Sequence, residues 1–173
     1  LSKEKCFVAS EERQQPGIAV DMIAGVQETL WTAPGGCMNV VADLCNPDVL
    51  WSIQGFYPVF DSEHAVIVRH EKIGGEWASK VMTHLPYAHR IALYLYEGRQ
   101  YLIACQLCGS KAFRDDWSSP GAVYVACTDC SDGLPLRFVP VLEGLTKNHG
   151  LTGYPERGFF LVSCEQGVYR LWI

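Results

Sequence analysis

The sequence lacks any run of basic residues, and it has no apolar stretch near the roughly 20 residues that a membrane-spanning helix needs. Its 14 Lys and Arg stand against 19 Asp and Glu, which gives a formal net charge of −5. A Gly-rich phosphate loop and a His-Glu-x-x-His motif are also missing. We therefore expect neither nucleic acid nor a membrane as a partner, and nothing favours nucleotide binding.

Helix-favouring runs rich in Ala, Glu, Lys and Leu are missing as well. Hydrophobic residues make up 49% of the chain and charged residues 19%, which is typical of a packed globular protein. Val, Ile, Tyr, Phe and Trp come in short clusters separated by Gly, Pro and polar residues. This pattern predicts an all-β protein.

An internal repeat is the strongest signal in the chain. The segments 81–89 and 141–149 align without a gap at an offset of 60 residues, and His89 and His149 close them. An apolar strand ending in Cys follows each His, at Cys105 and at Cys164. The repeat indicates that one structural unit recurs along the chain.

Each unit is predicted to hold four antiparallel strands joined by short turns. We expect strands at 38–44, 49–55, 64–70 and 77–83 in one unit, and at 90–96, 100–107, 121–127 and 137–143 in the next. The units then span residues 1–36 (three strands), 37–86, 87–146 and 147–173 (three strands). We expect the whole chain, 1–173, to be a single segment of this kind.

Four-stranded units at this spacing predict a partial β-propeller of about three to four blades. Helical solenoids and parallel α/β sheets need helices that the sequence does not supply. A β-sandwich would not explain the internal repeat. Because a ring usually has about four to eight blades, we expect a fragment of a larger propeller, with the remaining blades as its partner.

Several segments resemble bacterial β-propeller proteins of the FG-GAP or VCBS-repeat type. They are Leu-Pro-Tyr-Ala-His-Arg-Ile at 85–91, Tyr-Leu-Ile-Ala-Cys at 101–105, Asp-Asp-Trp-Ser-Ser-Pro-Gly at 115–121, Lys-Asn-His-Gly at 147–150 and Ser-Cys-Glu-Gln-Gly-Val-Tyr at 163–169. The resemblance covers roughly residues 50–173 and implies a propeller fold. Sugar dehydratases or lyases, lectins and scaffolds are similar at the fold level only. The Asp-rich calcium loop of such repeats is missing, so calcium binding is not implied.

His89 and His149 are the first candidate site, because each directly precedes the innermost strand of a predicted blade. Equivalent positions of successive blades converge on one rim of the channel, where two imidazoles could share a divalent metal or do acid–base catalysis. Their neighbours Arg90 and Asn148 are candidate binding residues. The competing interpretation is structural: each histidine donates a hydrogen bond to a backbone carbonyl in a tight connection between strands.

Two Cys-x-x-Cys pairs form the second candidate, with Cys105, Cys108, Cys127 and Cys130 at a spacing that suits a four-Cys zinc site. The strand assignment opposes this, because Cys105 and Cys127 fall at opposite ends of adjacent strands. The alternatives are that these cysteines pack in the core and its loops or that they form a disulfide. Free cysteines ending apolar strands favour a reducing compartment such as the cytoplasm.

A third candidate is the loop with Asp115, Asp116 and Trp117, which suits either sugar binding or an ordinary Asx-type turn. Three functions stay open: a catalytic or binding domain with a small-molecule site at the channel mouth, for which a carbohydrate is one candidate ligand; a non-catalytic glycan- or protein-binding scaffold; and a zinc-stapled interaction domain. The sequence does not decide whether the protein is an enzyme.

Overall fold

The structure is a computed structural model that describes residues 5–8, 16–57, 59–129 and 135–173. In these ranges, fourteen strands form four antiparallel sheets, in which each strand pairs with its neighbours in the sequence. The all-β prediction is therefore confirmed. Among the described residues, only two short 3-10 helices interrupt the strands, η1 (Val59–His64) and η2 (Pro155–Arg157).

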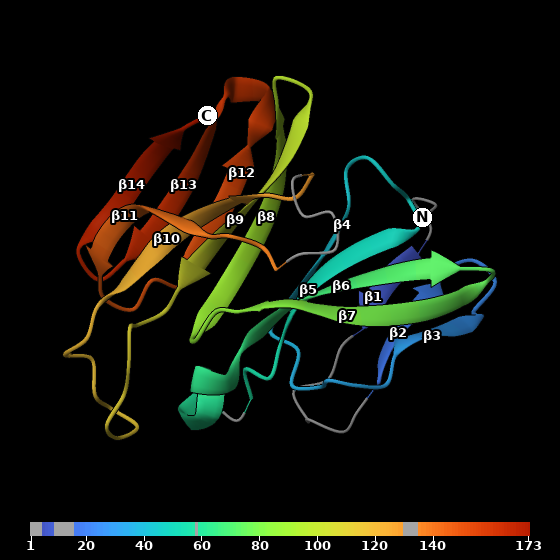
Figure 1. Cartoon of the computed structure of the whole chain (residues 1–173), viewed down its shortest axis with the longest axis horizontal. Coiled ribbons are helices and arrows are strands. Elements are labelled where there is room, and N and C mark those ends of the chain that lie inside the picture. Colours follow the sequence, from blue (N-terminus) through green and yellow to red (C-terminus); the bar gives the residue numbers. More distant parts are fainter. Residues whose placement is uncertain (1–4, 9–15, 58, 130–134) are drawn as a thin grey trace.

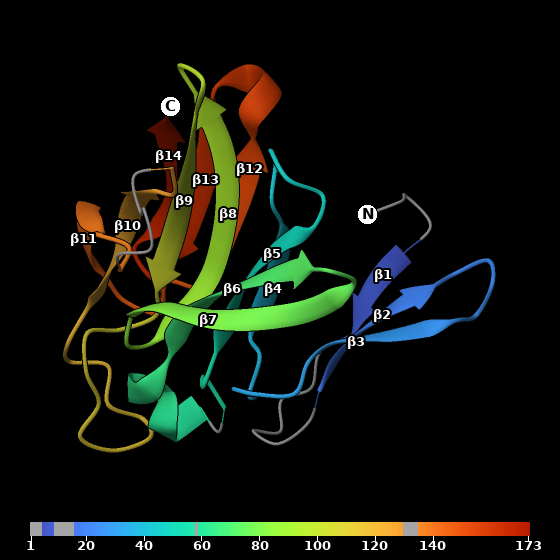
Figure 2. The same cartoon turned by 45° about the vertical axis from the view of Figure 1, so that its right-hand side comes forward.

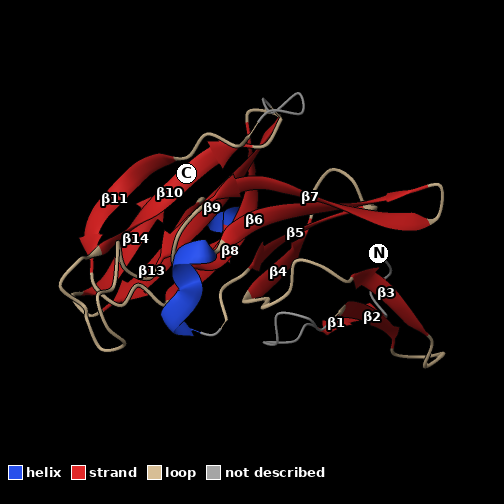
Figure 3. Ribbon diagram, turned by 60° about the horizontal axis from the view of Figure 1, so that its bottom comes forward, coloured by secondary structure: helices blue, strands red, loops and turns tan. Residues whose placement is uncertain are grey.

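The four sheets follow one another along the chain (Figures 1 and 3). Sheet I contains β1 (Lys5–Val8), β2 (Gly17–Asp21) and β3 (Gln27–Trp31). Sheet II contains β4 (Asn39–Ala42), β5 (Val49–Gln54), β6 (Val66–Ile73) and β7 (Glu76–His84). Sheet III contains β8 (Ala88–Tyr96), β9 (Arg99–Gln106), β10 (Gly121–Cys127) and β11 (Val139–Leu145). Sheet IV contains β12 (Gly150–Tyr154), β13 (Phe159–Cys164) and β14 (Gly167–Trp172).

These strands correspond closely to the predicted ones, with two corrections. His64 was expected to open a strand, but it ends η1, and β6 begins only at Val66. The first strand of sheet II was expected to run to residue 44, but β4 ends at Ala42, because the Asp43 carboxylate accepts hydrogen bonds from the backbone N–H groups of Cys45 and Asn46 and so forms a turn. Short turns join the strands as predicted: between β8 and β9, Glu97 and Gly98 both have a positive φ, as a two-residue hairpin turn with the twist of the strands requires.

The sheets pack face to face, so the inner ones are buried on both sides. In β9, Leu102 and Ala104 contribute to the core between sheets II and III, while Ile103 and Cys105 contribute to the core between sheets III and IV. Successive side chains of a strand point to opposite faces. This explains why every residue of β5 and most of β9 is buried, rather than every second one.

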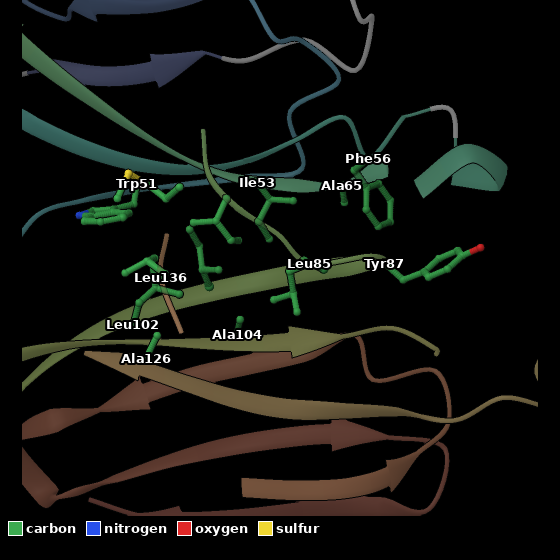
Figure 4. Packing of buried hydrophobic residues seen from close by; sticks show 14 of the residues in the cluster. Trp51, Ile53, Phe56, Ala65, Leu85, Tyr87, Leu102, Ala104, Ala126 and Leu136 are labelled. Atoms are coloured by element: carbon green, nitrogen blue, oxygen red, sulfur yellow. The ribbon is translucent and has the colours of Figure 1, made fainter. Parts of the chain in front are cut away.

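The core between sheets II and III is the largest (Figure 4). Trp51 and Ile53 of β5 face Leu102 and Ala104 of β9, with Leu136 between them. A smaller core between sheets I and II contains Leu30, Trp31 and Leu50.

The first strands of sheets II, III and IV are neighbours. β8 contacts both β4 and β12 (Figure 2). The side chain of Asn39 accepts a hydrogen bond from the Ile91 backbone N–H at 2.8 Å, which fixes the start of β4 against β8. The starts of these three strands therefore gather at one end of the molecule.

Candidate functional site

His89 occupies an irregular position at the start of β8. The β8–β9 register shifts between Ala88 and Arg90, so His89 sits at a bulge. Bulges redirect a side chain relative to the sheet. The His89 ring is buried, and it packs edge-to-face against Phe56 with ring centroids 5.5 Å apart.

His149 directly precedes β12 and is exposed. Its ring lies edge-to-face against His89, with centroids 4.9 Å apart and an interplanar angle of 85°. The two histidines, 60 residues apart in the sequence, also share a hydrogen bond, in which His89 Nδ1 donates to the His149 carbonyl at 3.1 Å. The structure thus brings the predicted pair together.

Backbone carbonyls set the tautomers of both rings. His149 Nδ1 lies 2.9 Å from the carbonyl oxygen of Lys147, as His89 Nδ1 lies near that of His149. A carbonyl only accepts hydrogen bonds, so each Nδ1 must carry a proton. In the neutral rings, both Nε2 atoms then have a free lone pair.

Burial keeps His89 neutral. Desolvation, the positive charge of Arg90 and the neighbouring His149 lower the pKa of His89 from 6.5 to about 4. At neutral pH the ring is therefore an acceptor at Nε2. A neutral imidazole whose other nitrogen donates to a carbonyl is the usual form of a metal-binding histidine.

Trp117 borders the pair. Its ring centroid lies 6.4 Å from that of His149. Lys111 Nζ lies 3.2 Å from the Trp117 ring centroid, and it donates to the carbonyls of Arg114 and Asp116 at 3.0 and 2.8 Å. Lys111 therefore fastens the 107–120 loop and holds the indole beside His149.

Asp116 organises the same loop. Its carboxylate accepts hydrogen bonds from the Ser118 hydroxyl at 2.6 Å, and from the backbone N–H groups of Ala112 and Ser118 at 3.0 Å each. These bonds lower the pKa of Asp116 to about 2. Both carboxylate oxygens are thus engaged within the loop, whereas Asp115 is exposed. This arrangement matches the Asx-turn alternative for Asp116.

The two neighbours of the histidines take different positions. Arg90 is half-buried, and its guanidinium donates to the carbonyls of His89 and Met38 at 3.3 and 3.5 Å. Asn148 is fully buried, and its amide donates to the Ala122 carbonyl at 3.3 Å. Asn148 thereby holds the turn that carries His149 against β10.

Three of the four cysteines of the alternative zinc site can be located, and Cys130 lies outside the described residues. Cys105 pairs with Val123 and Cys127 with Tyr101, so the two lie four positions apart along β9. At the rise of a strand this offset is about 13 Å. Burial raises the pKa of the Cys105 thiol to about 12 and that of Cys108 to about 11, which opposes the thiolate form that zinc requires.

Over the described ranges, no three His, Cys, Asp or Glu side chains gather as a metal-binding cluster. The histidine pair would therefore supply two protein ligands. No helix of the described part is long and apolar enough to span a bilayer.

Sequence reasoning missed two buried polar clusters. His70 stacks on Trp31 at 4.4 Å, and its ring nitrogens lie 2.8 Å from the hydroxyls of Ser52 and Ser79. Gln100 joins sheet III to the loop after β4 through Asp43. The sequence gives no signal for either cluster, because their partners lie on other strands and loops and only the fold brings them together.

Comparison with known proteins gives a fold neighbour and no family. No family model matches the chain, and no curated protein matches it. Among solved structures, it is similar to a chain of Kuenenia stuttgartiensis hydrazine synthase, with a TM-score of 0.65 and 12% identity over 98% of this chain and 49% of that one. The chain thus spans about half the length of that structure. At this identity the likeness concerns the fold alone.

Proposed function

We propose that the chain is part of a β-propeller and that the rim where β4, β8 and β12 begin binds a small molecule through a divalent metal on His89 and His149. The propeller is supported by sheets that recur as sequential antiparallel units and by first strands that lie side by side, as the innermost strands of blades do. The remaining blades would be further polypeptide. The FG-GAP or VCBS resemblance stays a hypothesis.

The observation that carries the site is the shared tautomer of the two rings. Each Nδ1 faces a backbone carbonyl, so each Nε2 keeps its lone pair for a ligand, and the two ring centroids are only 4.9 Å apart. Imidazole nitrogen suits zinc and other late divalent metals better than calcium or magnesium. Two protein ligands leave further coordination positions for water and a ligand.

Trp117 would form the side of the ligand site. A half-buried indole beside polar anchors is a common arrangement for binding a sugar ring, and the exposed Asp115 could accept its hydroxyl groups. The carbohydrate class is therefore our first choice of ligand. If the site instead works without a metal, the same two imidazoles would be the candidate acid–base groups of an enzyme.

Zinc titration of the metal-stripped chain by calorimetry tests the proposal. His149→Ala, at an exposed position, and His89→Ala should each weaken zinc binding by more than about tenfold. His84→Ala, at the exposed end of β7, is the matched control and should leave it unchanged.

Cys108→Ser separates the two metal hypotheses. Loss of zinc binding in this variant alone would favour the zinc-stapled domain and overturn the histidine site. Absence of zinc binding in the unmodified chain would leave the metal-free glycan- or protein-binding scaffold as the better account.

A further inference from the structure

Sheet IV is one strand shorter than the two sheets before it. Sheets II and III each have four strands, whereas sheet IV ends at β14. Within the described part of the chain, β14 pairs with β13 alone, and in Figure 1 it forms the outer edge of its sheet. An edge strand presents a row of backbone N–H and C=O groups that can pair with another strand.

An apolar groove of about 340 Å³ lies beside this edge, between sheets III and IV. Its lining includes side chains from both sheets, namely Val125, Val141, Phe160, Leu171 and Trp172. Trp172 and Val141 are 68% and 52% exposed, which is high for large apolar side chains. The open edge and the groove thus coincide.

The molecule itself shows how such a groove is closed. In the equivalent space between sheets II and III, Leu136 lies between Trp51 on one side and Leu102 and Ala126 on the other (Figure 4). Its backbone N–H donates to the Met82 carbonyl at 3.1 Å, and the side chain is buried.

Phe138 follows two residues later, packs against the same core and lies edge-on to Tyr124. Both residues lead into β11, the fourth strand of sheet III. The segment that leads into a fourth strand therefore supplies the side chains that close the space to the preceding sheet.

The surroundings of Leu136 have counterparts around the open groove. Leu102 comes from the second strand of its sheet, as Phe160 does, and Ala126 comes from the third, as Leu171 does. Met82 comes from the fourth strand of the preceding sheet, as Val141 does. No equivalent of Leu136 and Phe138 lines the groove among the residues that the structure describes.

We propose that β14 and this groove bind an extended strand from a polypeptide outside these 173 residues. The strand runs antiparallel to β14, and the segment that leads into it carries two large apolar side chains two residues apart, which enter the groove. Backbone pairing provides the strand's orientation, and the apolar pair provides its selectivity.

The probe is a synthetic peptide with the sequence of residues 135–145, because it contains Leu136, Phe138 and a strand already shaped for this role. Hydrogen exchange of the β14 amides is measured with and without the peptide. Binding should slow exchange in β14 by about tenfold or more at saturation. A peptide carrying Leu136→Asp should give no protection.

Val141→Glu in the protein places a charge in the groove at an exposed position, and it should abolish the protection. Ile73→Glu, at a residue 63% exposed in the β6–β7 hairpin, is the matched control and should retain it. Unprotected β14 amides at saturating peptide would overturn the proposal. A dimer in sedimentation that Val141→Glu dissolves would show that a second copy of this chain occupies the edge instead.

Discussion

Replacing Gln100 by Ala should weaken the connection between sheets II and III at the end remote from the histidines. Gln100 is buried at the start of β9. Its amide donates to the Asp43 carboxylate at 2.7 Å and to the Thr128 hydroxyl at 3.1 Å, and its oxygen accepts from the Leu44 N–H at 2.9 Å. Asp43 also accepts from the Trp51 indole at 2.8 Å. One amide thus joins two sheets and a loop.

The expected cost follows from the bonds that are lost. A hydrogen bond to a charged group contributes about 1.5–3 kcal/mol, and one between neutral groups about 1 kcal/mol. Leu44 is exposed, so in the variant its backbone N–H can donate to water, which offsets part of the lost hydrogen bond. Gln100→Ala should therefore lower the free energy of unfolding by about 2–3 kcal/mol at pH 7.

The effect should depend on pH. Desolvation raises the pKa of Asp43, but hydrogen bonds from Gln100, Trp51 and two backbone N–H groups together outweigh it and lower the pKa below 3.8. A depressed carboxyl pKa contributes stability above the unfolded value, and this contribution is lost as pH falls through the folded value. The difference between wild type and Gln100→Ala should therefore shrink in acid.

Urea denaturation followed by tryptophan fluorescence measures both effects. Gln27→Ala, at an exposed position of β3, is the control and should change the unfolding free energy by less than about 0.5 kcal/mol. If Gln100→Ala were as stable as this control at pH 7, the hydrogen-bond reasoning would be refuted.

Two further predictions concern buried side chains. Burial holds the pKa of His70 at about 4, so the folded ring stays neutral while the unfolded chain binds a proton near pH 6.5. The free energy of unfolding should therefore fall as the pH is lowered from about 6.5 to about 4. His70→Phe should make this fall less steep, and it should lower the free energy of unfolding at pH 7 by about 1–3 kcal/mol because the bonds to Ser52 and Ser79 are lost. Urea titrations at several pH values measure both effects. Leu136→Ala should lower the free energy of unfolding in urea by about 2–5 kcal/mol, because it leaves a cavity between sheets II and III. A loss below about 1 kcal/mol would contradict the inference that this side chain fills the space between the two sheets.

Much of the fold could be predicted from the sequence because the signals were local. Continuous apolar runs such as 101–105 and the Glu97–Gly98 turn identify strands and hairpins directly. The offset of 60 residues between the two repeats indicated how these strands group into units. η1 was missed because Val59–His64 has no helical periodicity, and a single 3-10 turn needs none.

The site was predictable only in part. The repeat placed His89 and His149 at equivalent positions, and the structure shows them in contact. The bulge that redirects His89 and the carbonyls that fix both tautomers depend on strand register and backbone geometry. The same limit applies to Gln100 and His70, whose polar partners are 57 and 18 residues away in the chain.

The most direct test of the histidine site is a long-range proton–nitrogen NMR correlation of the imidazoles at pH 7, recorded before and after addition of zinc. We expect His89 to carry its proton on Nδ1, and we expect zinc to shift the Nε2 resonances of His89 and His149 while leaving His84 unchanged. A proton on Nε2 of His89, or Nε2 resonances of the pair that zinc does not move, would contradict the account.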